Sequence, residues 1–204
     1  MKSETRIDKQ SSNPKGIGLQ SWFQSNKWGY VASVSLLPYA IFKTLWALGV
    51  PIGATQKAIE DMHANMEAYS GPVFSFLYRY GIDITALLAI IAIFLALALV
   101  RPWGQRFPKW IPIFGGRKFH RWLLLFPAWV GGMLFTIFGG VSVIDMGLMG
   151  LGIKPSGNMD GLEPWVFMIV YGGFFIWGFT ICLAALSYQT RTRNRKAENN
   201  QTFL

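Results

Sequence analysis

Lys43 is a cation within an otherwise apolar stretch that covers residues 29–50. This stretch is long enough to cross a membrane as a helix. Lys43 lies fourteen residues into it, roughly 10 Å below its outer end at 1.5 Å per residue. A charge at that depth costs several kcal/mol unless it is paired, hydrated or able to reach the membrane surface. Lys43 therefore needs either an anionic partner or a route for its ammonium to the surface.

Four further residues are expected near the depth of Lys43. Asp83 begins the next apolar stretch, which runs in the opposite direction, and Asp145 ends the third stretch. Tyr171 lies about seven residues into the fourth stretch, and Tyr39 precedes Lys43 by one helical turn. These positions predict a polar ligand-binding pocket formed by Lys43, Asp83, Asp145, Tyr171 and Tyr39.

A second arrangement also satisfies these charges. Lys43 then extends outward to the membrane surface, and Asp83 pairs with Arg79, four residues earlier. Because the sequence does not determine how a helix is rotated about its axis, both arrangements stay open. The direction of the Lys43 side chain distinguishes them.

Other residues with metal-binding or nucleophilic side chains have simpler explanations. His63 with Glu60 and Glu67 presents nitrogen and oxygen groups on one helix face, but a solvated acidic face explains them better, and we expect no metal site. Cys182 is the single cysteine, forms no internal disulfide and is typical of a small apolar residue. The sequence contains no nucleophile motif and no phosphate-binding glycine loop, so we predict no catalytic residues and no cofactor.

The composition indicates which elements position these residues. Hydrophobic residues make up 52% of the chain and charged residues 14%, against about 25% charged residues in soluble domains. The apolar residues gather in four blocks of membrane-spanning length, at about 29–50, 82–100, 122–144 and 165–188. We therefore predict an all-α integral membrane protein with a four-helix membrane domain over residues 28–188, which excludes a soluble enzyme. Tails at 1–27 and 189–204 flank this domain.

The two outer loops differ in pattern. Residues 54–70 predict a short amphipathic helix on the outer surface, with Thr55 as its N-cap and Gly71-Pro72 as its stop. Its apolar residues recur at three- and four-residue steps: Ile59, Met62, Met66 and Tyr69. Residues 145–163 show no such periodicity, and we expect an irregular segment there.

Lysine and arginine are distributed unevenly between the two sides. Fifteen of the nineteen lie in segments 1–27, 101–121 and 189–204, and three lie in the other loops. Basic loops stay in the cytoplasm, so we expect both termini on the cytoplasmic side of a bacterial plasma membrane. Anionic lipid headgroups attract such segments by about 1 kcal/mol per cation. The net charge of +9 is thereby explained without a nucleic-acid partner.

Small residues form a stripe in the third apolar block. Ala128, Gly132, Thr136 and Gly140 recur every four residues, a spacing that lets helix backbones approach closely. The stripe predicts either a homo-oligomer interface or packing within the bundle.

Several sequence strings resemble one protein group. They are Pro38-Tyr39-Ala40 with Trp46-Ala47-Leu48-Gly49, Arg101-Pro102-Trp103-Gly104, and Pro127-Ala128-Trp129-Val130-Gly131-Gly132. Together they resemble a widespread group of small bacterial four-span membrane proteins of unassigned function, over about residues 36–188. The resemblance implies the same membrane fold and supplies no activity, cofactor or catalytic residue.

These observations favour a non-enzymatic multi-pass membrane protein that binds a small molecule or lipid in the pocket around Lys43. A membrane subunit or interaction partner of a larger complex is the first alternative. A lipid-modifying membrane enzyme is the second.

Overall fold

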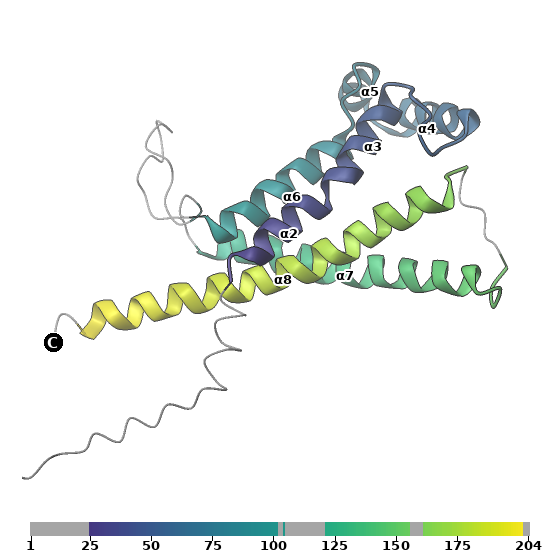
Figure 1. Cartoon of the computed structure of the whole chain (residues 1–204). Coiled ribbons are helices and arrows are strands. Elements are labelled where there is room, and N and C mark those ends of the chain that lie inside the picture. The colour runs from purple at the N-terminus through teal and green to yellow at the C-terminus, as the bar shows by residue number, and fades with distance from the viewer. Residues whose placement is uncertain (1–24, 102–103, 105–120, 156–160, 202–204) are drawn as a thin grey trace, which may run out of the picture.

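The computed structural model of this chain describes residues 25–101, 104, 121–155 and 161–201 (Figure 1). These residues form an all-helical fold without β-strands, as predicted. The helices are α2 (Lys27–Ser35), α3 (Leu37–Ala47), α4 (Gln56–Tyr69), α5 (Pro72–Arg79), α6 (Ile84–Val100), α7 (Arg121–Gly150) and α8 (Pro164–Gln201).

Among the described residues, two helices are long and apolar enough to cross a membrane, Arg121–Gly150 and Pro164–Thr192. α5 and α6 meet the same requirement only when taken together, and they are bent by 84° at the break between them. Length and composition therefore give two candidate spans, or three if this bent pair is one span. The prediction of four membrane spans is not confirmed by these helices.

α2 and α3 follow one another along a single direction (Figure 1). Leu36 separates them but keeps a helical backbone, with φ −90° and ψ −11°, and its carbonyl accepts a hydrogen bond from Ala40 N at 3.1 Å. The interruption is expected because Pro38 has no N–H to donate and restricts the residue before it. Residues 27–47 thus form one interrupted helix where the sequence predicted a single span.

α8 packs along α7 and also lies against α2 and α3, while α6 packs on α2 and α3 (Figure 1). The core is apolar, with Ala32, Leu99, Leu125 and Ile181 all buried. Many large apolar side chains on the outward faces of α6, α7 and α8 are exposed. An apolar surface of this extent marks a site of contact with another apolar phase or molecule.

The stripe of small residues in α7 faces α8 of the same chain. Ala128 is fully buried, and a Cβ added at Gly132 would lie 2.5 Å from the Cys182 sulfur. At the C-terminal end of the stripe, the glycine closest to α8 is Gly139, which was not among the predicted residues. A Cβ at Gly139 would lie 2.5 Å from the backbone nitrogen of Phe175. Gly140, the predicted fourth member, is less closely packed because four-residue steps rotate around a helix of 3.6 residues per turn. A second chain is not needed to cover Ala128 and Gly132.

α4 and α5 form a helical hairpin at the end of α3 and α6 (Figure 1). The predicted helix over 54–70 is present as α4, and the side chain of its N-cap Thr55 accepts a hydrogen bond from Ala58 N at 3.2 Å. Gly71-Pro72 ends α4, as predicted. Pro72 also begins α5, which the sequence analysis missed although proline suits the first turn of a helix.

Two expectations, for residues 145–163 and for Tyr69, change. Residues 145–150 are not irregular but continue α7, and 156–160 lie outside the described residues. Tyr69 does not lie on the buried face of α4, because its side chain is 87% exposed. The tail after residue 188 continues α8 as a helix to Gln201. The tail at 1–24 and most of the basic loop 101–121 lie outside the described residues.

Candidate functional site

Lys43 of α3 and Asp83 at the start of α6 form an ion pair, with 3.1 Å between Nζ and Oδ2. The Asp83 side chain is 2% exposed and that of Lys43 is 20% exposed. Arg79, the other cation considered for Asp83, pairs instead with Glu67 at 2.8 Å. The structure therefore has the inward of the two arrangements that the sequence left open.

Asp83 is held in place by the start of α6. Its Oδ1 accepts hydrogen bonds from Thr85 N at 2.6 Å and Thr85 Oγ1 at 2.5 Å. This is the role of a helix N-cap, and a carboxylate also suits the positive end of a helix dipole. The turn before it places Gly81 at φ +76°, where a Cβ would collide with Leu48. One oxygen of Asp83 thus caps α6, and the other binds Lys43.

Tyr39 and Tyr171 extend this polar cluster toward α8. The Tyr39 hydroxyl hydrogen-bonds the Thr85 side chain and interacts electrostatically with Asp83 and Tyr171. The Tyr39 and Tyr171 rings both pack on Phe174, with centroids 4.8 Å and 5.8 Å away. Four of the five predicted residues, Lys43, Asp83, Tyr39 and Tyr171, thus belong to one connected cluster.

The sequence analysis missed Thr85, which links Tyr39 to Asp83. Its position two residues after a helix-capping aspartate is the available signal, because an N-cap side chain accepts from the N2 or N3 backbone N–H.

Asp145 has a different partner. Its carboxylate pairs with Lys154, and both side chains are exposed. The predicted end of the third helix at residue 144 is the source of the difference. α7 continues to Gly150, and a turn with Gly152 at φ +72° follows, so that Lys154 returns beside Asp145. The structure does not place Asp145 in the Lys43 cluster.

The α4–α5 hairpin is attached to the C-terminal end of α3. His63 Nε2 lies 3.0 Å from the Trp46 carbonyl oxygen, and because a carbonyl only accepts, this nitrogen donates. The His63 ring also packs edge-on against Tyr78 at 5.0 Å. Burial and the nearby Asp83 carboxylate raise the pKa of Tyr78, which lies in α5, to about 12. His63 is therefore engaged in packing rather than with Glu60 or Glu67.

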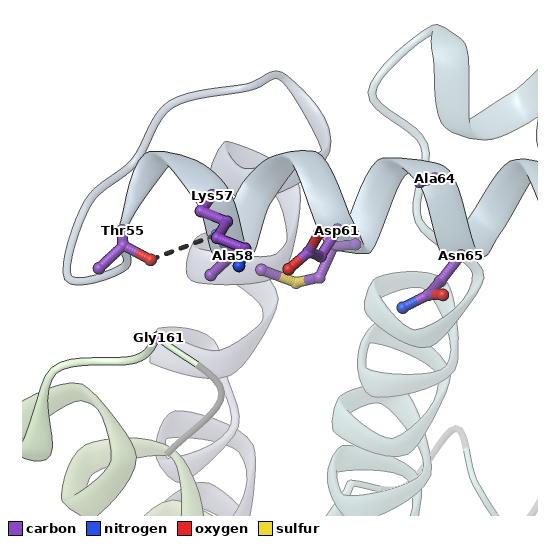
Figure 2. A pocket seen from close by; sticks show the side chains of 8 residues that line it. Thr55, Lys57, Ala58, Asp61, Ala64, Asn65 and Gly161 are labelled. Atoms are coloured by element: carbon purple, nitrogen blue, oxygen red, sulfur yellow. Dashed lines mark hydrogen bonds between the residues drawn. The ribbon is translucent and has the colours of Figure 1, made fainter. Parts of the chain in front are cut away.

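Two hollows flank α4. The first, of about 530 Å³, is lined by Thr55, Lys57, Ala58, Asp61, Met62, Ala64, Asn65 and Gly161 (Figure 2). Figure 2 shows Lys57, Asp61 and Asn65 on one side of α4, and Gly161 on the loop that faces the start of this helix. The second, of about 450 Å³, is lined by Gly49, Gln56, Ile59, Glu60, His63, Ala64 and Glu67. Neither hollow is lined by Lys43 or Asp83.

The start of α4 is joined to the start of α8 beside the first hollow. Thr55 N donates to the Gly161 carbonyl at 2.8 Å, and Glu163 N donates to the Gly53 carbonyl at 2.8 Å. Gly161 has φ +78°, and a Cβ there would lie 2.5 Å from Thr55 Oγ1. This contact holds one end of the hairpin against α8.

Comparisons of this chain with protein-family models, with curated proteins and with solved structures find no match. They do not bear on the resemblance to small bacterial four-span membrane proteins, which stays a prediction. A function for this chain is therefore argued from its residues and their geometry.

Proposed function

We propose that this chain is a non-enzymatic, multi-pass protein of the bacterial plasma membrane. Its four spans are the interrupted helix α2–α3, then α6, α7 and the apolar part of α8. Residues 27–47 make a helical segment roughly 30 Å long, and α6 is roughly 25 Å long at 1.5 Å per residue. These lengths are close to the thickness of the hydrocarbon core, about 30 Å.

The outward surface supports this topology. Exposed apolar side chains occur on all four proposed spans, as at Ile41, Ile91, Ile137 and Phe179. In water, an apolar surface of this kind drives association with other molecules. In a bilayer, apolar lipid tails cover the same side chains without a free-energy penalty. With fifteen of the nineteen basic residues on one side, both termini face the cytoplasm, where their cations attract anionic lipid headgroups.

The proposed activity is binding of a small molecule or lipid with an anionic group, at Lys43 in the outer half of the bundle. The buried Lys43–Asp83 pair carries this proposal. Ionisable residues within membrane spans are costly and mark functional sites by default. An ammonium has three donors, and the 3.1 Å contact with Asp83 occupies one of them. The Lys43 side chain is 20% exposed and that of Asp83 only 2%, so Lys43 is the member of the pair that an anionic group can approach.

The test is retention of anionic lipid by the purified protein. We expect native mass spectrometry to detect phosphatidylglycerol bound to the natural sequence, and to detect its loss in the double variant Lys43→Gln, Asp83→Asn. This variant removes both charges, so no buried carboxylate is left without its cation. Lys154→Gln is the matched control, because it removes a lysine from an exposed ion pair with Asp145.

Equal lipid retention by the natural sequence and the double variant would refute a binding site at Lys43. Loss of lipid from both the double variant and Lys154→Gln would indicate a general effect of surface charge.

A second candidate function is that of a membrane subunit in a larger complex. The length of α8 favours it: the helix continues to Gln201, nine residues beyond the end of its apolar span at Thr192. The sequence of this extension contains Arg193, Arg195 and Lys196. Co-purification of a defined partner that is lost when residues 193–204 are deleted would support this function.

A further inference from the structure

α5 exposes large apolar side chains on one face. Val73 and Phe76 of α5, and Tyr80 directly after its end, are 67%, 59% and 69% exposed, and they follow one another at three- and four-residue steps. Phe76 and Tyr80 also contact each other, with ring centroids 5.0 Å apart. Tyr69, at the end of α4, adds a further exposed ring. The apolar face of α5, formed by Val73, Phe76 and Tyr80, is uncovered in the described part of the chain.

The opposite face of α5 is firmly packed. Tyr78 is buried and lies against His63. Ser75 Oγ donates to the carbonyls of Met66 and Ser70, both at 3.2 Å, and so joins α5 to the end of α4. Arg79 binds Glu67 across the same corner. The apolar face is therefore held in a fixed direction by a packed hairpin.

The direction of α5 differs from that of the adjoining span. An 84° bend separates α5 from α6, so α5 lies nearly parallel to the membrane surface if α6 crosses the membrane. Eight residues extend roughly 12 Å as a helix, far short of the hydrocarbon core. Along the chain, exposed apolar residues follow from α5 into α6, since Ile82 between the two helices and Leu88 in α6 are also exposed.

We propose that α5 is an in-plane membrane anchor whose apolar face inserts into the outer leaflet of the same bilayer. The inference rests on the proposed membrane topology. The succession of exposed apolar residues from α5 through Ile82 into α6 favours the leaflet as the occupant, because α5 directly precedes a helix whose exposed side chains the lipid covers. Aromatic side chains are enriched at the membrane interface, and an apolar helix face binds there in proportion to its buried area.

The anchor has a consequence for the candidate site. α4 and α5 lie over the outer end of α3, where His63 binds Trp46. Insertion of α5 into the leaflet holds this hairpin at the headgroup level, beside the Lys43–Asp83 pair. A lipid bound at Lys43 would then pass the edge of α5.

The test uses a fluorescent label at single cysteines in a Cys182→Ala background. The labelled positions are Phe76→Cys on α5, Val73→Cys on the same face, Glu60→Cys on the exposed side of α4 and Ile91→Cys on the lipid-facing side of α6. The protein is reconstituted into vesicles of phosphatidylcholine and phosphatidylglycerol. Quenchers are a lipid nitroxide near the headgroup, a lipid nitroxide deep in the acyl chain, and iodide in water.

We expect the labels at Phe76→Cys and Val73→Cys to lose most fluorescence to the shallow nitroxide and little to iodide. Glu60→Cys should be quenched by iodide, and Ile91→Cys by the deep nitroxide. Agreement between the two α5 positions excludes a local disturbance by either substitution.

Quenching of both α5 labels by iodide to the extent seen at Glu60→Cys would overturn the anchor. Stronger quenching by the deep nitroxide than by the shallow one would also overturn it, because α5 would then enter the core of the bilayer. If Ile91→Cys is not quenched by either lipid nitroxide, the membrane topology itself is wrong. If Ile91→Cys is quenched and the α5 labels are not, only the anchor is wrong.

Discussion

The Asp83 carboxylate performs two structural tasks with its two oxygens. Oδ1 accepts from Thr85 and caps α6, and Oδ2 binds the Lys43 ammonium at 3.1 Å. Removing one member of a buried ion pair is costlier than removing both, because a single removal leaves an unpaired charge away from water. The pair and the cap can therefore be separated by substitution.

Lys43→Met leaves Asp83 without its cation, and we expect the free energy of unfolding to fall by about 3 kcal/mol. Adding Asp83→Asn should restore most of this loss, since asparagine caps a helix as well as aspartate does and carries no charge. Thermal unfolding in detergent measures both effects. Arg79→Met is the control, because its pair with Glu67 is exposed and should matter little. A double variant no more stable than Lys43→Met would contradict the argument.

At the scale of elements, the α7–α8 contact depends on residues without side-chain bulk. Gly132 and Gly139 of α7 both face α8. On the α8 side, a Cβ at Gly178 would collide with the backbone of α7. The close approach lets the two long helices pack along their backbones, as small residues do in membrane helix pairs.

Gly139→Ala tests this contact most directly. Its Cβ would lie 2.5 Å from the backbone nitrogen and 2.9 Å from the Cα of Phe175, atoms that cannot move without shifting α8. We expect a loss of about 1–3 kcal/mol, the usual cost of overpacking. Gly147→Ala in the same helix is the matched control, since nothing lies within 4 Å of its added Cβ. There the better helix propensity of alanine predicts equal or higher stability. Equal melting temperatures of Gly139→Ala and the natural sequence would refute the close contact.

At the scale of the whole molecule, the uneven distribution of lysine and arginine predicts one topology, with both termini in the cytoplasm. Reporter fusions or cysteine labels at residues 10, 110 and 200 should report the cytoplasm, and those at 65 and 155 the outside. Position 65 lies in α4, so this experiment also tests which side of the membrane the α4–α5 hairpin occupies. Labelling of position 110 from outside intact cells would overturn the topology and the placement of the anchor together.

Periodicity, composition and capping residues make much of this molecule predictable from its sequence. Apolar blocks marked the long helices, because length and hydropathy are local properties of the chain. Thr55 and Gly71-Pro72 marked the bounds of α4 for the same reason. α5 was missed because Gly71-Pro72 was interpreted only as the stop of α4, although a proline in this position also starts the next helix.

The sequence by itself determined that the chain is helical and apolar, and that Lys43 needs either an anionic partner or a route to the membrane surface. Only the tertiary structure decided between these two arrangements, because the rotation of α3 about its axis depends on packing against α6 and α8. That packing brings Lys43 to Asp83 and places Thr85 between Asp83 and Tyr39. The continuation of α7 and the turn after it bring Lys154 to Asp145. Likewise, the packing of α7 against α8 makes Gly139, rather than Gly140, the closest contact between these two helices. A four-residue sequence repeat drifts around the helix, whereas two packed backbones meet along one line.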